Sequence, residues 1–466
     1  MQPYLDIFNR VVNNHLNKTR DVIQTTQIQD LDTQLDLQLQ AKGADLKTLE
    51  AVLQAFLEHS PDAAHPDFFK QLYAGRNKAA LIGDWVASLS NVNMHTYQVS
   101  PVATLMEREV IKAWRDLVGY KTGEGMIVPG GSQANLVGMM LGRHHACPNF
   151  KTQGADGRRL RAYVSDQAHY SSQKAANTLG LGTDNLIGVA SDKQGRLCTQ
   201  ALKAQIEADL ALGYHPFYIG LTAGTTVTGA FDPVLECRQI ADEYDLWLHI
   251  DGAWGAPVLF SPKHRQLLEN AQLSDSFSWD AHKLMGVPLT TAAILVKQDG
   301  ALTECCGGGG SNYLFHADQY AHLNLGPASL QCGRRADALK VWLSWKDLGN
   351  EGYAQQVDHL QELRQYCVEQ INANPNFEKI APAPYLNVLF QFKPDHITDE
   401  SILAKLNISI CQNMAHNGGP FVDYASYHGR TGIRLILANE LTTTEDIDRF
   451  LQHCNATGNK LLAEML

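Results

Sequence analysis

The 466-residue sequence predicts an α/β fold in which a mostly parallel sheet carries helices on both faces. The first observation is that short β-rich runs alternate with helical segments, such as 134–147 and 202–211, which is typical of strands joined by crossover helices. The second is that glycine-rich or polar residues directly follow several runs, at the strand ends where such sheets bind ligands. The runs read MIVP, RAYV, LIGVA, PFYIGLT, LWLHI and AAILV.

Three segments are predicted along the chain. Residues 1–88 form a helical arm, because LKTLEAVLQAFLEHSP repeats apolar residues at helical spacing and stops at Pro61. Residues 89–345 form the large domain that contains the alternating pattern. Residues 346–466 form a smaller α+β domain, with a long helix through QVDHLQELRQYCVEQINANP and strands at YLNVLFQF and GIRLILAN. The arm is too thin to hold a core of its own.

The composition of the chain argues against several classes of protein. The formal net charge is −11 and no basic stripe is visible, which argues against a nucleic-acid-binding protein. No apolar run approaches the roughly 20 residues that span a bilayer, and the polar N-terminus lacks the core of a signal peptide. Nine scattered cysteines without CxxC pairs are typical of free thiols in a cytoplasmic protein. No metal site is expected, since the neighbours His144 and His145 point to different helix faces.

The chemistry of the chain is organised around SWDAHKLMGVP, which contains Lys283. A lysine is rarely buried, and burial lowers the pKa of its amine and makes the amine nucleophilic. That is what a lysine needs to form a Schiff base with a carbonyl compound. Taken alone, the stretch favours an ordinary surface lysine at a strand end.

Three further motifs lie upstream of this lysine. VPGGSQAN places a glycine-rich turn, Gly130 to Asn135, before an apolar helix, where free N–H groups can hold a phosphate. SDQAHYSSQKAA contains His169, and LWLHIDGAWGAP ends a strand at Asp251. The turn is neither GxGxxG nor a P-loop, which argues against dinucleotide and ATP binding. A glycine-rich turn, a histidine, an aspartate and a lysine in this order form a set that holds pyridoxal 5′-phosphate (PLP).

These motifs and several others resemble the group II PLP-dependent amino-acid decarboxylases, in the branch that acts on glutamate, cysteine sulfinate and aspartate. The resemblance runs from about residue 65 to about residue 439. It implies the aspartate-aminotransferase-like fold (fold type I). The matching stretches are HPDFFKQLYAG, NVNMHTYQVSPVATLMER, PGGSQAN, QAHYSSQKAA, TAGTTVTGAFDP, LHIDGAWG, WDAHKLM, SNYLF and QCGRRADALKVWLSWK.

The resemblance implies a role for each matching residue. Lys283 is expected to bind the cofactor covalently, Asp251 to lie beside the pyridine nitrogen, and His169 to stack on the ring. Tyr313 is expected on a mobile catalytic loop that begins with the glycines at 307–310. Gly333 is expected to close the phosphate site of a neighbouring subunit, so the resemblance implies a homodimer with its active site at the interface. The expected cofactor-binding residues are Gly131, Ser132, His169, Thr226, Asp251, Ala253, His282, Lys283 and Gly333.

Two residues depart from the pattern of the family. Asp280 stands where an asparagine often hydrogen-bonds the phosphate, and two anions there would repel each other. Either Asp280 turns away, or another donor such as His282 neutralises it. His95 stands where related enzymes for acidic substrates often carry an aromatic residue, in a position that shapes the substrate pocket.

The predicted function is α-decarboxylation of an amino acid to an amine and carbon dioxide, with aspartate, cysteine sulfinate or glutamate as the leading substrates. Gln71 and Arg434 match positions that hold the substrate carboxylate in the acidic branch, and an arginine fork suits that group. Enzymes for aromatic substrates can also carry an arginine there. Decarboxylation of a diamino acid such as 2,4-diaminobutyrate or of an aromatic amino acid therefore remains an alternative, as does another PLP reaction such as transamination.

Overall fold

The computed structural model describes residues 1–465 apart from 19–20, 24–29, 32–34, 36 and 309–312. Within it the chain divides into two compact units. The larger unit comprises Arg76–Gln365 and Ala381–Val388, and the smaller comprises Met1–Gly75, Tyr366–Ile380 and Leu389–Leu466. Within the described ranges, no helix combines the length and apolar composition that crossing a membrane requires.

The larger unit is built on a seven-stranded sheet in the order β1-β7-β6-β5-β4-β2-β3. The pairs from β6 to β3 are parallel, whereas β7 runs antiparallel to both β6 and β1. The mostly parallel sheet predicted from the sequence is confirmed. The strands are β1 (Glu124–Val128), β2 (Leu160–Ser165), β3 (Leu186–Val189), β4 (His215–Thr222), β5 (Trp247–Asp251), β6 (Ser276–Asp280) and β7 (Ala292–Val296).

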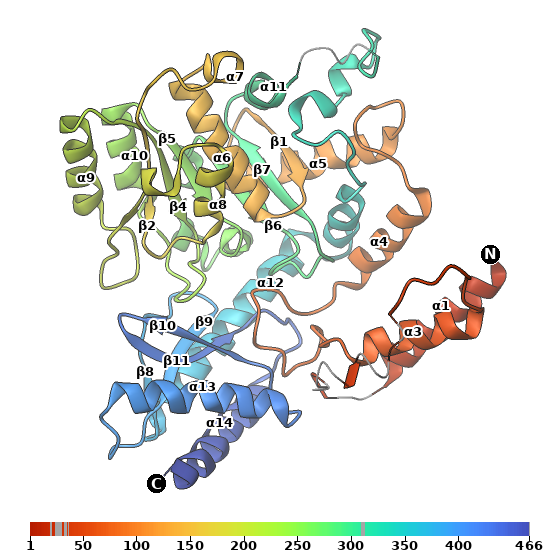
Figure 1. Ribbon diagram of the computed structural model, residues 1–466, viewed down its shortest axis with the longest axis vertical. Helices are drawn as coiled ribbons and strands as arrows, with labels where there is room; N and C mark the ends of the chain where they lie inside the picture. The colour runs from red at the N-terminus through yellow and green to blue at the C-terminus, as the bar shows by residue number, and fades with distance from the viewer. Residues whose placement is uncertain (19–20, 24–29, 32–34, 36, 309–312, 466) are drawn as a thin grey trace. The chain divides into compact units, whose positions relative to one another are not determined.

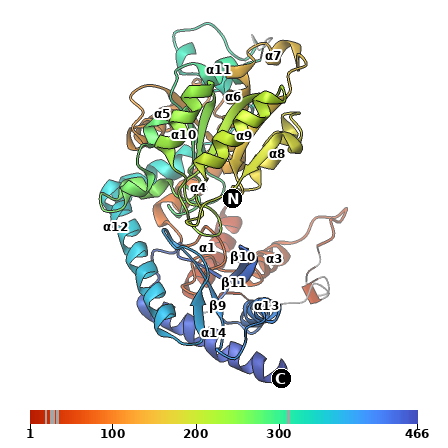
Figure 2. The same cartoon turned by 90° about the vertical axis from the view of Figure 1, so that its left-hand side faces the viewer.

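Helices cover both faces of this sheet, with α9 and α10 on one side of it and α6 and α8 on the other (Figure 1). Figure 2 shows α9 and α10 side by side. The α-helices of the unit are α4 (Lys78–Ser90), α5 (Pro101–Val118), α6 (Gly131–Ala146), α7 (Phe150–Gln153), α8 (Ser171–Thr178), α9 (Thr199–Ala211), α10 (Val234–Tyr244) and α11 (Ala301–Cys306). Its short 3₁₀ helices are Thr183–Asn185, Ala256–Phe260, Arg265–Leu268, Ala271–Leu273, Ala321–Leu323 and Gly326–Ala328.

Helix α6 lies unusually close to the sheet because two glycines face it. A Cβ atom at Gly138 would come within 2.5 Å of Nδ1 of His249, and one at Gly142 within 3.0 Å of the Trp247 and Tyr218 side chains. Any larger residue at Gly138 would push the helix away from β5. Apolar side chains of α6, such as Val137 and Leu141, join strand residues such as Ile294 in a buried core. The glycines therefore set the distance between the start of α6 and the ends of β5 and β6.

The smaller unit contains a four-stranded sheet in the order β10-β11-β9-β8. β10 pairs antiparallel with β11, and β8 with β9. Helix α13 packs on β11 and against α14, and α1 packs against α3. The elements are α1 (Gln2–Asn17), α3 (Leu46–Glu58), β8 (Phe377–Lys379), β9 (Asn387–Phe392), α13 (Glu400–His416), β10 (Asp423–Tyr427), β11 (Arg430–Ile436) and α14 (Thr444–Met465).

Helix α12 (Ala338–Ala373) contributes residues to both units. It is interrupted at Gly349, whose φ of 63° and ψ of −178° are not helical. Glycine reaches positive φ without the steric cost that a Cβ atom brings. The long helix and the two strands predicted for the C-terminal part correspond to α12, β9 and β11.

Candidate active site

Two neighbouring strands present a row of polar side chains toward α6. Side chains alternate between the two faces of a strand, so every second residue points the same way. On β5 that face carries Trp247, His249 and Asp251, and on β6 it carries Ser276, Ser278 and Asp280. The register pairs His249 with Ser276 and Asp251 with Ser278. The strand order thus gathers six polar side chains into one layer beneath α6.

Asp251 is the centre of this layer. Its carboxylate accepts hydrogen bonds from Nδ2 of Asn135 at 2.6 Å, from the Ala253 backbone N–H at 3.1 Å and from Oγ of Ser278 at 3.1 Å. All three donors are neutral, and within the described part of the chain Asp251 forms no ion pair with a lysine, arginine or histidine. Its negative charge is therefore left for a cationic group of a ligand.

His169 lies between β2 and α8, close to Asp251. Its Nδ1 accepts a hydrogen bond from the Ser171 backbone N–H at 3.2 Å, and Oγ of Ser171 accepts one from Nδ2 of Asn135 at 3.0 Å. Burial lowers the pKa of His169, while the charge of Asp251 acts in the opposite direction. The imidazole is therefore neutral at pH 7, which suits a flat ring that stacks on another ring.

Lys283 follows β6 and points toward Asp280. Its Nζ lies 3.3 Å from Oδ2 of Asp280, and Nε2 of His282 lies 3.6 Å from the same oxygen. The lysine side chain keeps 21% of its surface exposed, whereas Asp280 is almost fully buried. The amine is thus accessible from one side and held by a carboxylate on the other.

The start of α6 meets the same carboxylate. A Cβ atom at Gly131 would lie 2.7 Å from both oxygens of Asp280, so only glycine fits there. Gly130 caps the helix without a side-chain hydrogen bond. The first N–H groups of a helix lack partners within the helix and attract anions. The predicted phosphate cradle thus lies at the start of a helix, and the Asp280 carboxylate lies beside it.

These residues fit PLP in three respects and disagree in one. The amine of Lys283, the unpaired charge of Asp251 and the neutral ring of His169 suit an aldehyde, a pyridine nitrogen and an aromatic face. The disagreement is Asp280, whose buried Oδ1 has no hydrogen-bond partner in the described structure.

Of the two sequence-based explanations for Asp280, the structure contradicts the first. Asp280 does not turn away, because it lies against Gly131 and Lys283. Burial lowers the pKa of His282, so the imidazole beside Asp280 is neutral at pH 7 and carries no positive charge to offset the carboxylate. The nearby cation is Lys283 itself.

Four other predicted residues of the larger unit stand outside the layer around Asp251. The carbonyl of Thr226 accepts a hydrogen bond from Nδ2 of Asn387 at 2.9 Å. Gly333 is exposed beside Asn93. The carbonyl of His95 accepts a hydrogen bond from Gly326 at 3.0 Å.

Tyr313, the fourth, is 79% exposed. In the run of four glycines predicted to begin its loop, Gly309 and Gly310 lie outside the described residues, as do Ser311 and Asn312.

The two predicted substrate-binding residues belong to the smaller unit. Arg434 is on β11 opposite Asp423, and its Nη2 donates to the Lys70 carbonyl at 2.9 Å. Burial lowers the pKa of its guanidinium, partly offset by Asp423. Gln71, the next residue after Lys70, is half-buried. The hydrogen bond from Arg434 thus holds the backbone of Lys70, the residue before Gln71, next to the arginine side chain.

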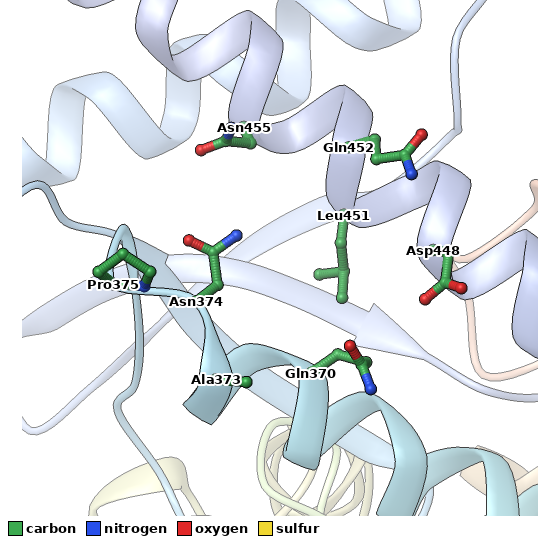
Figure 3. Close-up of a pocket in the computed structure, with 8 residues that line it drawn as sticks. All are labelled: Gln370, Ala373, Asn374, Pro375, Asp448, Leu451, Gln452 and Asn455. Atoms are coloured by element: carbon green, nitrogen blue, oxygen red, sulfur yellow. The ribbon is translucent and has the colours of Figure 1, made fainter.

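A hollow in the smaller unit contains none of the predicted site residues (Figure 3). Amides and one carboxylate line it, and Asp448 already accepts a hydrogen bond from the Tyr366 hydroxyl at 2.8 Å. It is lined by Gln370, Ala373, Asn374, Pro375, Asp448, Leu451, Gln452 and Asn455. Among the residues with described positions, no group of three or more His, Cys, Asp or Glu side chains is placed to hold a metal ion.

Sequence reasoning missed three residues that hold Asp251 in place: Asn135, Ser278 and, through Asn135, His249. One signal was available. In LWLHID and SFSWD, polar residues recur at every second position, which places them on one face of a strand. A polar face on a strand buried between helix layers indicates a site rather than plain core.

Comparison with known proteins agrees with this geometry. Residues 29–393 match the family model described as the pyridoxal-dependent decarboxylase conserved domain. The chain is 34% identical to human cysteine sulfinic acid decarboxylase, over 98% of this chain and 95% of that protein. It is also 34% identical to human acidic amino acid decarboxylase GADL1, over 92% of this chain and 84% of that protein.

Solved structures give the same result. The crystal structure of mouse CSAD in apo form superposes with a TM-score of 0.94 at 33% identity, and the match covers 98% of each chain. Identity at this level over nearly the whole length establishes a common family. The chain belongs to the pyridoxal-dependent decarboxylase family and is a PLP-dependent amino-acid decarboxylase.

Proposed function

We propose that the substrate is an acidic amino acid, namely aspartate, cysteine sulfinate or glutamate. The observation that carries the proposal is 34% identity, over almost the whole chain, to relatives named for cysteine sulfinic acid and for acidic amino acids. Arg434 supports it, because a guanidinium offers paired donors to a carboxylate or a sulfinate. Gln71, adjacent to the hydrogen bond between Arg434 and Lys70, is the second proposed contact to this group, and His95 is proposed to shape the pocket.

When bound, PLP supplies the electron sink that accepts the electron pair left as carbon dioxide departs. Lys283 is proposed to hold it covalently, since its side chain is partly exposed directly beside Asp280, the last residue of β6. Asp251 is proposed to keep the ring nitrogen protonated, because a carboxylate that has only neutral donors favours a cationic neighbour. His169 is proposed to stack on the ring and orient the substrate.

The remaining proposed cofactor contacts follow from position. Gly131 and Ser132 lie in the first turn of α6, where backbone N–H groups suit a phosphate. His282 and Ala253 flank Lys283 and Asp251 along the chain. Thr226 and Gly333 are proposed on the match of their motifs alone. Tyr313 is proposed to protonate the substrate carbon after carbon dioxide has left, on a loop that excludes water.

A homodimer is the proposed assembly. On α4, Ile82, Trp85, Val86 and Leu89 form an exposed stripe at helical spacing, while Gly83 and Ala87 face inward. Large apolar side chains gathered in this way mark an interaction surface. A second copy of the chain is the proposed occupant, since Gly333 in this family closes the phosphate site of a neighbouring subunit. The nine unbridged cysteines support a cytoplasmic location.

Replacing Lys283 by alanine should abolish covalent retention of the cofactor. Purified wild-type protein incubated with PLP and then dialysed should stay yellow, and Lys283→Ala should lose the visible absorbance. Lys297→Ala is the matched control, because this lysine lies beyond β7. A colourless wild-type protein would contradict the assignment of the site.

Carbon dioxide release across aspartate, glutamate, cysteine sulfinate, 2,4-diaminobutyrate, histidine and tyrosine should favour the first three. Arg434→Met should raise KM for the preferred acidic substrate by about tenfold, the effect of losing one hydrogen bond to a charged group. Arg430→Met is the control on the same strand, because Arg430 pairs with Glu378 and Glu400 instead. Preference for diaminobutyrate or tyrosine would refute the acidic class, and an unchanged KM would remove Arg434 from the pocket.

Charging the α4 stripe should dissociate the dimer. The double variant Val86→Asp/Leu89→Asp should sediment as a monomer, because two carboxylates would be buried without partners. Leu212→Asp is the matched control, since Leu212 is equally apolar and also well exposed but lies at the end of α9. The assembly proposal fails if wild-type protein is monomeric, or if the double variant keeps the wild-type mass.

Tyr313→Phe should separate loss of carbon dioxide from formation of the amine. Without a proton donor at the substrate carbon, the first turnovers should release carbon dioxide but yield aldehyde and pyridoxamine phosphate. Activity should then decline as that form of the cofactor accumulates. Chromatography of the products is the measurement. Steady amine production by the variant at the wild-type rate would show that another group delivers the proton.

A further inference from the structure

Beneath the site, five side chains form a continuous hydrogen-bonded chain from Trp247 to Asp251. Nε1 of Trp247 lies 2.8 Å from Oγ of Ser276, which lies 2.8 Å from Nδ1 of His249. Nε2 of His249 lies 3.0 Å from Oδ1 of Asn135, whose Nδ2 lies 2.6 Å from Asp251. Ser276, His249 and Asn135 are at most 4% exposed, and Trp247 is 6% exposed. Asp251, at the end of the chain of hydrogen bonds, is partly exposed.

The two ends fix the direction of every bond in this chain except the one between Ser276 and His249, whose direction follows if His249 is neutral. An indole N–H can only donate, and an ionised carboxylate can only accept. Asn135 must therefore turn its amide nitrogen to Asp251 and its oxygen to His249, which then donates from Nε2. Nδ1 of His249 is left to accept from the Ser276 hydroxyl, whose oxygen accepts from Trp247. The geometry thus selects one tautomer of a neutral imidazole.

The surroundings of His249 keep it neutral. Burial lowers its pKa to about 4, even though the charge of Asp251 acts in the opposite direction. The titratable groups that face it are Asp251 on its own strand and Tyr218 on β4, whose pKa is raised by burial so that it is uncharged. From α6 and β6 it meets Asn135, Gly138 and Ser276. A protonated His249 would have no acceptor at Nδ1 unless Ser276 reversed its bond.

Asn135 connects this chain to the rest of the site. Besides Asp251, its Nδ2 donates to Oγ of Ser171 at 3.0 Å, and the backbone of Ser171 holds His169. One amide on α6 therefore fixes the aspartate on β5 and the loop of the histidine before α8. Helix α6 also begins at the proposed phosphate cradle, so the same helix carries that cradle and the amide that contacts Asp251 and Ser171.

We propose that Asn135 and His249 are positioning residues that keep Asp251 oriented and anionic for the ring nitrogen of the cofactor. The chain donates to Asp251 without bringing a positive charge near it. A cation in the place of Asn135 would satisfy the carboxylate and weaken its hold on a protonated ring. This inference rests on the proposed role of Asp251 and extends it to two residues that are argued to act through Asp251.

The test uses PLP labelled at its ring nitrogen and nitrogen NMR of the bound cofactor. In wild-type protein the signal should be that of a protonated pyridine at neutral pH. His249→Leu removes the donor to Asn135, and should shift the signal toward neutral pyridine and weaken PLP binding by about tenfold. His249→Gln can still donate from the equivalent position, and should restore both readouts to within about threefold of wild type.

Two controls separate the possible outcomes. Tyr120→Phe removes a buried hydroxyl pair with Ser274, which precedes β6 and belongs neither to the chain from Trp247 nor to the donors of Asp251, so it should lower stability without moving the ring signal. Asp251→Asn should move the signal at least as far as His249→Leu. If Asp251→Asn leaves the signal unchanged, the proposed site itself is wrong. If Asp251→Asn moves it and a folded His249→Leu does not, only the positioning role is overturned.

A second measurement does not depend on any variant folding. Nitrogen NMR of histidine-labelled wild-type protein should show His249 neutral and protonated at Nε2 at neutral pH, whether or not PLP is bound. An imidazolium would overturn the proposal because it would bring a positive charge near Asp251. A neutral ring protonated at Nδ1 would overturn it because Nε2 could not donate to Asn135.

Discussion

The candidate site depends on the hydrogen bonds that hold one partly exposed carboxylate, Asp251, at the end of β5. An ionised carboxylate in a protein interior is stable only if donors satisfy its oxygens, and otherwise it takes up a proton. Asp251 meets this condition with three neutral donors from α6, β6 and its own turn. The close contact of α6 with β5 through Gly138 is what brings the first donor within reach. The close packing of α6 on the sheet thus provides one of the hydrogen bonds that stabilise the Asp251 carboxylate.

The sequence predicted the fold class, and it predicted several residues of the candidate site whose roles stay proposals, because both leave local patterns. The alternation of β-rich runs with helical segments predicted the mostly parallel sheet, and all six runs are strands. Lys283, Asp251 and the turn at Gly130 were found because they directly follow strands, where such sheets bind ligands. A residue at the end of a predicted strand can be identified from the sequence without knowing which strands pair in the sheet.

The supporting residues could not be found in this way, because their roles depend on strand order. Ser276 and Ser278 act on His249 and Asp251 only because β6 pairs with β5 in that register. Asn135 reaches both strands from a helix more than a hundred residues earlier in the chain. Small polar residues of this kind are common in any sequence, so only their spatial convergence distinguishes them.

Asp280 shows how a departure from a family pattern follows from the same physics as the pattern. The start of a helix carries partial positive charge and favours any anion placed there, whether a phosphate or a carboxylate. Asp280 lies against Gly131 in the first turn of α6 and pairs with Lys283 at 3.3 Å. Both features stabilise its charge despite almost complete burial. The partial positive charge at the start of α6 therefore both predicts a phosphate cradle there and stabilises the buried Asp280 beside it.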